Sequence, residues 1–352
     1  MNKLAQYTAT TINWRRQLQI NERRSKFVIG VFVLIYVVIG LIIDLYLHPE
    51  LDKFSISQAI WFLLTFKVVP VATLLLGGVA TVSVLLTYAW YDRIMLLGTK
   101  CHEITADKQC SLIEQQLYNV IEELKIAAGI RYMPKIYLIE ADYMNAFASG
   151  YSEKSALVAI TRGLLNKLER SELQAVMAHE LSHIRHHDIK LTLMASVLSN
   201  IVLIAIDIVF RGIIFGGRGR RRNGGGLVII IFLLRFLLPL ITVLLLLYLS
   251  RRREFMADAG AVELMRDNGP LAKALLKIND DHRDNKEKCQ EAYGTTPHEE
   301  VRQAAYIFDP KQMGISLRQS IGEIFSTHPS IDSRLQALGF YNKKNNVENS
   351  GN

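Results

Sequence analysis

The sequence contains little cysteine. Its three cysteines, Cys101, Cys110 and Cys289, form an odd set without C-x-x-C spacing. That pattern argues against a disulfide framework and against a zinc site built from cysteines. The polar part of the chain is therefore expected to lie in a reducing compartment such as the cytosol.

The N-terminus lacks the apolar stretch of a cleavable signal peptide. Residues 1–26 are polar and basic instead, and a short interfacial helix is expected at 13–20. Acidic residues are outnumbered in the whole chain, with 33 Asp and Glu against 41 Lys and Arg. Because the basic residues lie mostly beside apolar runs, we expect them to contact anionic lipid headgroups and to set the membrane topology. No nucleic-acid partner is expected.

Long apolar runs account for much of the 50% hydrophobic content. The runs at 27–43 and 68–90 are long enough to span a bilayer, which needs about 17 to 25 residues. Between them, 60–66 either extends the second helix or lies at the interface. Because a basic segment precedes the first run, the positive-inside rule predicts a cytoplasmic N-terminus.

A second membrane hairpin is predicted at 191–250, around a flexible Gly/Arg-rich segment at 216–226. If both of its runs span the bilayer, Arg218–Arg222 lie on the far side, against the positive-inside rule. Asp207 and Arg235 also fall inside the runs, where charge is costly. Two explanations stay open. Either the hairpin packs partly against the soluble domain or tilts into the interface, or the first pair of spans dominates the orientation.

The segment between the hairpins has the composition of a soluble domain. An amphipathic helix is predicted at 111–128, with an apolar stripe that begins at Leu112. Strands are predicted at 135–139 and 156–161, and another helix begins at Leu164. A strand in this region either pairs with an extended peptide substrate or serves only as scaffold.

One short stretch, His179-Glu180-Leu181-Ser182-His183, contains the pattern His-Glu-x-x-His. A helix is predicted here, from Ser171 as N-cap to Asp188, so the two histidines share one face. Two neutral imidazoles at this spacing can hold a zinc ion, and the glutamate can hold a water against it. The alternative is a surface helix with two solvated histidines.

A hydrolytic zinc site needs a third protein ligand beside an open position for water. The next polar stretch after the second hairpin, 251–259, is predicted as a helix with Glu254 and Asp258 on one face. Glu254 is the candidate third ligand, and Asp258 is the candidate acceptor for the second ring N–H of a ligand histidine. The alternative is a solvated Arg/Glu helix end at a membrane boundary.

Together these motifs resemble a known family. His179–His183, Asp188 and Glu254–Asp258 are similar to the integral-membrane zinc metalloproteases of the HtpX heat-shock type, which are relatives of the CAAX prenyl proteases. Asn145-Ala146-Phe147-Ala148 and His328-Pro329 also match that family's pattern. The resemblance extends over nearly the whole chain and includes both apolar hairpins.

The resemblance implies one Zn²⁺ per chain, held by His179, His183 and Glu254, with Glu180 as general base. It implies a multi-pass protein of the bacterial cytoplasmic (inner) membrane, with the active site facing the cytoplasm. The implied role is membrane-protein quality control and stress response, through cleavage of damaged or misfolded membrane proteins.

The resemblance also places Asn145 and His328 near the cleft, where either can help to stabilise the transition state. Asp188 is a further candidate to support the ligands. Arg334 is another candidate oxyanion donor, although a structural ion pair is the favoured interpretation for it. A capping role before Pro329 is the alternative for His328.

The remaining histidines are not expected to bind the metal. His186 and His187 are expected on the surface. His282 and His298 fall in a polar stretch, 279–300, that is predicted to be a mobile surface segment or lid.

The predicted fold class is α+β and mainly α, with four membrane-associated helices and a zincin-like catalytic domain that carries a small β-sheet. The expected function is a zinc endopeptidase whose partners are membrane-protein or peptide substrates and the lipid bilayer. The expected organisation is a basic cytoplasmic segment (1–26), a first transmembrane hairpin (27–91), the first half of the catalytic domain (92–190), a second membrane hairpin (191–250), the second half of the catalytic domain (251–341) and a disordered tail (342–352).

Three other functions were weighed against the endopeptidase. An intramembrane protease is disfavoured because the charged, amphipathic helix around His179 belongs at or outside the interface. A non-catalytic membrane scaffold or chaperone is disfavoured because the expected ligands and general base are all intact. A nucleic-acid-binding membrane protein would rest on the Arg218–Arg222 segment alone.

Overall fold

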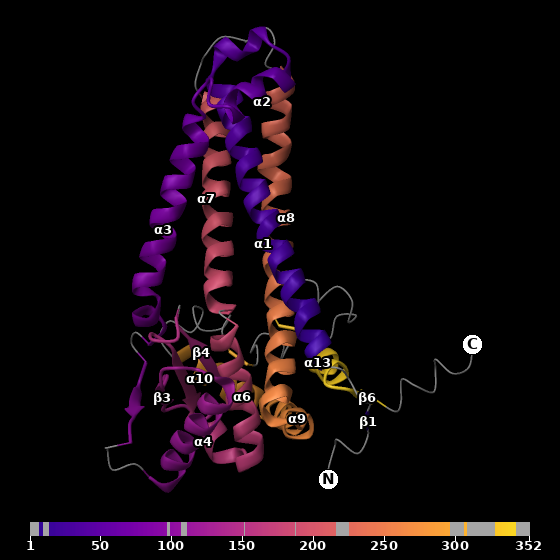
Figure 1. The fold of residues 1–352 in the computed structure, drawn as a ribbon. Coiled ribbons are helices and arrows are strands. Elements are labelled where there is room, and N and C mark those ends of the chain that lie inside the picture. The colour runs from indigo at the N-terminus through magenta and orange to yellow at the C-terminus, as the bar shows by residue number, and fades with distance from the viewer. Residues whose placement is uncertain are drawn as a thin grey trace, which may run out of the picture. The chain divides into compact units, whose positions relative to one another are not determined.

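The computed structural model divides into two compact units, which we describe separately (Figure 1). The sheet-containing unit comprises Met1–Ser25, Trp90–Lys190 and Leu247–Asn352, and the helical unit comprises Lys26–Ala89 and Leu191–Leu246. The structure describes residues 7–9, 14–96, 99–106, 111–150, 152–186, 188–215, 225–295, 306–307 and 328–342.

The helical unit is built from long apolar helices that pack around a common core. Tyr36, Ile39, Ile201, Ile231 and Leu238 are buried members of this core. The helices that contribute to the unit are α1 (Trp14–Leu47), α2 (Ile56–Leu64), α3 (Val71–Leu96), α7 (Asp188–Phe215) and α8 (Gly225–Met265), with a short 3-10 turn, η2 (Pro49–Lys53).

Two described helical stretches are long and apolar enough to cross a membrane, Ala195–Gly212 and Val228–Met265. They correspond to the two runs of the predicted second hairpin. The first hairpin is represented by shorter apolar stretches, Val33–Leu47 and Val71–Ser83. Four spanning helices therefore remain a prediction. The segment 60–66 does not extend the second helix, because α2 is a separate helix with its own capping box at Ser55.

Asp44 directly follows the first predicted apolar run, 27–43, but lies within helix α1. Helix α1 continues past it to Leu47, and the Asp44 side chain is fully buried. Its carboxylate accepts hydrogen bonds from the backbone N–H groups of Ala72 (2.7 Å) and Thr73 (3.0 Å) and from the Thr73 hydroxyl (2.7 Å). The first N–H groups of a helix have no acceptor within the helix. Asp44 therefore caps the N-terminus of α3 from a different helix.

The charges inside the second hairpin are paired with each other. Asp207 of α7 forms an ion pair with Arg235 of α8 (Nε to Oδ1, 2.8 Å) and accepts a hydrogen bond from Arg211 on its own helix (Nε to Oδ2, 2.7 Å). Pairing lowers the cost of placing charge in an apolar run. The Arg218–Arg222 segment lies outside the described residues.

The sheet-containing unit has a four-stranded mixed sheet in the order β2-β3-β5-β4. Strand β3 runs parallel to β5, and the other neighbours are antiparallel. The predicted strands at 135–139 and 156–161 are confirmed in place. The strands are β2 (Cys101–Ile104), β3 (Lys135–Ile139), β4 (Ala146–Ser149) and β5 (Leu157–Thr161), and a separate pair joins β1 (Tyr7–Ala9) to β6 (Phe340–Asn342).

Helices surround this sheet within the same unit. The predicted amphipathic helix is confirmed as α4, which begins after the N-cap Ser111 and ends at Gly129 in a left-handed conformation. Its buried face begins at Glu114 and Leu117, so including Leu112 in the apolar stripe was wrong, since that side chain is 87% exposed. The helices are α4 (Leu112–Ala128), α5 (Arg162–Lys167), α6 (Arg170–Arg185), α9 (Gly269–Asp284), α10 (Lys286–Thr295) and α13 (Ile331–Ala337).

The polar stretch from 279 is helical over its described part, and most of its described side chains are partly or fully exposed, but His282 is not. The stretch forms the end of α9 and all of α10, and the His282 side chain is fully buried. Lys167 of α5 pairs with Asp281 of α9 (2.6 Å), which anchors the end of α9 to the domain. His282 continues the buried face that Leu275 and Ile278 form earlier on α9. His298 lies outside the described residues.

Candidate metal centre

The His-Glu-x-x-His stretch lies on α6, as predicted, but the helix boundaries differ. The N-cap is Glu169, whose backbone N–H donates to the Glu172 carboxylate at 2.9 Å. Ser171 is thus inside the helix, and its predicted capping role was wrong. The helix ends at Arg185, and Asp188 begins α7. These caps fix α6 so that His179, Glu180 and His183 are all buried.

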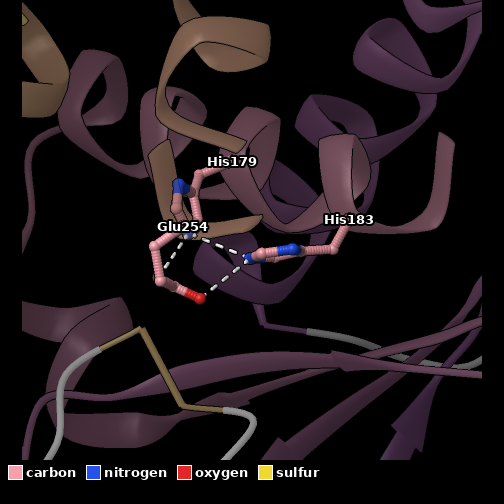
Figure 2. Close-up of side chains that lie close together, drawn as sticks. All are labelled: His179, His183 and Glu254. Carbon is pink, nitrogen blue, oxygen red and sulfur yellow. Dashed lines mark hydrogen bonds and ion pairs between the residues drawn. The ribbon is translucent and has the colours of Figure 1, made fainter. Parts of the chain in front are cut away.

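Figure 2 shows that Glu254 of α8 faces both histidines of α6. One donor atom from each of the three side chains lies within 4.8 Å of the others. His179 Nε2 is 3.2 Å from His183 Nε2, and each of these nitrogens is 3.6 Å from one oxygen of Glu254. The tertiary structure therefore brings the predicted third ligand to the histidine pair.

Each histidine is oriented by a carboxylate behind it. His179 Nδ1 lies 3.0 Å from Asp258 Oδ1, and His183 Nδ1 lies 2.9 Å from Asp188 Oδ2. A carboxylate at Nδ1 holds the proton on that nitrogen and leaves Nε2 as a lone-pair donor. Both Nε2 atoms face Glu254, so Asp258 and Asp188 occupy the outer positions predicted for them.

The electrostatics of the cluster favour a cation. Burial alone lowers the pKa of His179, but hydrogen bonds from its ring to the Asp258 and Glu254 carboxylates outweigh burial and raise the pKa to about 9. Two imidazoles and one carboxylate are the donor set of hydrolytic zinc sites, and metal ligation requires that the imidazoles be deprotonated. A proton held on His179 therefore occupies the place that a divalent cation would take.

Glu180 is also buried, with 1% of its surface exposed. Burial is the largest influence on the pKa of its carboxyl group and raises it. Among the described residues neither carboxylate oxygen has a hydrogen-bond partner. A buried carboxylate without a partner is costly unless something else at the site satisfies it. A metal-bound water beside the cluster fits that requirement, so the residues present fit a zinc centre.

Arg334 closes the cluster on the Asp258 side. Its side chain is 1% exposed and binds both Asp258 oxygens, Nε to Oδ2 at 2.9 Å and Nη2 to Oδ1 at 2.6 Å. The remaining nitrogen, Nη1, donates to the Ile307 carbonyl at 2.8 Å and lies 3.8 Å from Glu254 Oε2. These contacts agree with the ion-pair role favoured for Arg334.

His328 is brought to the cluster as well. Its Nδ1 lies 3.4 Å from Glu254 Oε2, and the side chain is 2% exposed. The alternative of a capping role was wrong, because Ser330 caps α13 by accepting from the Ser333 backbone N–H at 3.2 Å. His328 is therefore positioned beside the candidate third ligand.

Asn145 lies immediately before β4 and is fully buried. Its backbone N–H donates to the Thr161 hydroxyl (2.9 Å), and its side-chain oxygen accepts from the Ala146 N–H (3.1 Å). The outer edge of β4 is partly occupied, since Ile307 donates to the Ala146 carbonyl (2.9 Å) beside a bridge between Phe147 and Tyr306. No local pattern in the sequence pointed to Tyr306 and Ile307, because their roles depend on pairing with a distant strand.

His186 is not a surface residue. It is half-buried, burial lowers its pKa, and its Nδ1 has no hydrogen-bond partner among the described residues. Among the described residues, the group of side chains placed to share a metal ion consists of His179, His183 and Glu254. His187 lies outside the described residues.

Comparison with known proteins assigns the family. The sequence profile of Peptidase family M48 matches residues 111–340, which include both histidines, Glu254, His328 and Arg334. The chain belongs to peptidase family M48. The predicted HtpX-type resemblance is confirmed, and the chain is a protease of this family.

Two curated M48 relatives cover most of the chain. A "Protease HtpX homolog" of Helicobacter pylori (strain Shi470) is 37% identical over 93% of this chain and 98% of its own length. A "Protease HtpX homolog" of Listeria monocytogenes serotype 4a (strain HCC23) is 36% identical over 71% of this chain and 83% of its own length.

A solved structure is also similar to this M48 peptidase. The crystal structure of S. mikatae Ste24p aligns with 96% of this chain and 69% of that chain, at 18% identity and a TM-score of 0.48. The family assignment rests on the sequence matches, since a structural likeness of this size decides nothing further.

Proposed function

We propose that this M48 peptidase is a membrane-anchored zinc endopeptidase. One Zn²⁺ would be held by His179, His183 and Glu254, the buried cluster whose donor atoms lie within 4.8 Å of one another. The single observation that carries the proposal is that Glu254, far from the histidines in sequence, faces both of their Nε2 atoms (Figure 2). When bound, the zinc would lower the pKa of a water ligand and polarise the scissile carbonyl.

Glu180 is proposed as the general base. Its buried, unpaired carboxylate accepts a proton from the attacking water and delivers it to the leaving amine. Burial raises the pKa of Glu180, which makes its carboxylate a better proton acceptor than an exposed glutamate. Asp258 and Asp188 keep the histidines oriented throughout, because each binds an Nδ1 atom.

His328 and Asn145 are proposed to act near the substrate. His328 lies 3.4 Å from Glu254, so a donor from its ring can reach an oxyanion that develops beside the metal ligands. Asn145 precedes β4, the outer strand of the sheet, where an extended peptide can pair. The edge is occupied at Ala146 and Phe147, so such pairing is limited to Ala148 and Ser149.

The proposed setting is the bacterial cytoplasmic membrane. The apolar stretches of α7 and α8 support membrane insertion, and curated relatives carry the name "Protease HtpX homolog". We propose an active site on the cytoplasmic side, formed by 92–190 and 251–341. Damaged or misfolded membrane proteins are the proposed substrates, in membrane-protein quality control and stress response, and no nucleic-acid partner is expected.

Substitution of the general base tests the mechanism. Glu180→Gln keeps the shape of the side chain but removes the base, so purified protein in detergent should retain zinc and lose cleavage by at least about 100-fold. Glu123→Gln is the matched control, because Glu123 is 53% exposed on α4 and binds only at the surface to Arg170. Full cleavage by Glu180→Gln, measured on an unfolded membrane-protein substrate, would overturn the mechanism.

A further inference from the structure

Helices α6 and α8 make an unusually close approach at Gly260. A Cβ atom at this position would lie 2.6 Å from Ser182 Oγ, 2.9 Å from Ser182 Cβ and 3.3 Å from His186 Cε1. Contacts below 3.0 Å are not tolerated without movement of one partner. Ser182 has no room to yield, because it is fully buried and its hydroxyl donates to the Ala178 carbonyl at 2.8 Å.

Two side-chain contacts between α6 and α8 lie on either side of this close approach. On one side of it, His179 of α6 contacts Asp258 of α8 at 3.0 Å. On the other side, Arg185 of α6 pairs with Glu263 of α8 at 3.0 Å. Ser182 and Gly260 fall between these contacts on their respective helices. The distance between the helix backbones is therefore limited at this point, where no side chain separates Gly260 from Ser182.

The same pair of helices carries all three candidate ligands. Ser182 directly precedes His183, and Gly260 follows Glu254 and Asp258 on a continuous helix. Protein–metal bond lengths are held to within about 0.2 Å, whereas a Cβ at Gly260 requires a larger separation of the helices. A change in helix separation would thus move Glu254 away from His179 and His183.

We infer that Gly260 is a positioning residue for the metal centre: its missing side chain lets α8 approach Ser182 closely enough for Glu254 to share a metal ion with the histidines of α6. The inference rests on the proposed zinc site. It gives a functional reason for Gly260 inside a helix, where a glycine otherwise lowers helix stability.

The test is zinc affinity, measured by competition with a chelator on the full-length protein in detergent. Gly260→Ala improves helix propensity, yet we expect about a 10- to 100-fold loss of zinc affinity, the usual effect of disturbing the support of metal ligands. The d–d absorption of bound Co²⁺ supplies a second readout, since it reports the ligand geometry rather than the stability of the fold. Gly77→Ala is the matched control, because a Cβ there meets no atom within 4 Å.

A compensating substitution separates helix spacing from general damage. Ser182→Gly removes the side chain that a Cβ at Gly260 would meet, so the double variant Ser182→Gly/Gly260→Ala should recover most of the lost affinity. Glu263→Gln weakens the neighbouring ion pair without inserting an atom, and it should leave zinc affinity within about 3-fold, since partly exposed pairs contribute little.

The outcomes are distinguishable. Wild-type protein without zinc affinity would overturn the proposed centre and this inference together. Wild-type protein that binds zinc, with Gly260→Ala binding equally well, would overturn the inference alone. If Gly260→Ala does not fold, the double variant decides: folding and zinc binding support the close approach, and an unfolded or zinc-free double variant refutes it.

Discussion

Arg334 binds both carboxylate oxygens of Asp258, at 2.9 and 2.6 Å, and both side chains are buried. Asp258 in turn lies 3.0 Å from Nδ1 of His179. The candidate metal ligand is thus held by a carboxylate that is itself held by a guanidinium from α13. This arrangement links the C-terminal part of the sheet-containing unit to the helix that carries His179 and His183.

Removal of Arg334 should be strongly destabilising. Arg334→Met leaves Asp258 buried without its cation, a situation that costs about 3–5 kcal/mol in other proteins. The double variant Asp258→Asn/Arg334→Met should lose less stability than the sum of the single variants, because the uncompensated charge is gone. Denaturant unfolding in detergent measures both effects.

The control for this prediction is Arg170→Met. Arg170 makes a surface pair with Glu123, both more than half exposed, so its loss should cost no more than about 1 kcal/mol. Equal stability of Arg334→Met and Arg170→Met would show that the buried pair does not hold the site.

Glu254→Ala should abolish stoichiometric zinc binding. The remaining histidines provide only two ligands, and a hydrolytic zinc site uses three. Zinc content after dialysis against a weak chelator measures the effect. Glu263→Ala, on the same helix and paired only with Arg185 in the described contacts, should retain zinc. Unchanged zinc affinity of Glu254→Ala would remove Glu254 from the ligand set.

Buried His282 should make the protein less stable in mild acid. Burial lowers its pKa below the usual 6.5, against smaller, opposing effects of the Ile278 carbonyl and Asp281. At a pH between the folded and unfolded pKa values, His282 is protonated in the unfolded chain but neutral in the folded protein. The free energy of unfolding therefore keeps its full value above about pH 6.5 and falls as the pH decreases below that value.

The measurement is the difference in melting temperature between pH 7.5 and pH 5.5. His282→Gln cannot take up this proton, so its melting temperature should fall less over that interval than that of the wild type. The loss of packing lowers its stability equally at both pH values and does not enter the comparison. Parallel pH profiles for the two proteins would contradict the prediction.

Asp44→Asn should destabilise the helical unit. The substitution keeps one acceptor but removes the charge that caps α3 through Ala72 and Thr73, and loss of a helix cap typically costs about 0.5–2 kcal/mol. Asp52→Asn is the control, since Asp52 is exposed in η2. Thermal unfolding in detergent compares the two, and equal stability would exclude a capping role for Asp44.

Much of the candidate site was predictable because its signals are local. Helical periodicity places His179 and His183 on one face whatever the rest of the fold, and the same rule places Glu254 and Asp258 together on α8. Residues with β-branched and aromatic side chains between turn signals predicted β3 and β5 correctly. These patterns depend on neighbours within a few residues, which the sequence displays directly.

Errors arose where the deciding partner is distant in sequence. Asp44 directly follows the predicted apolar run at 27–43, and nothing near it in the sequence indicated that its carboxylate caps another helix. His186 and His282 were expected at the surface, since polarity alone does not show which face of a helix becomes buried. The N-cap of α6 shifted to Glu169 because the capping box with Glu172 prevailed over the more common serine cap.

The sequence by itself indicated the family, the histidine pair on one helical face, Glu180 as the candidate general base and a later helix with two carboxylates on one face. Only the tertiary structure decided that Glu254 meets both histidines, that Arg334 holds Asp258, and that Ser182 leaves no room for a side chain at Gly260. The physical reason is the range of the interactions. Backbone hydrogen bonding fixes spacing within a helix, whereas the separation of α6 and α8 follows from side-chain packing at a single crossing, to which each helix contributes one side of the contact.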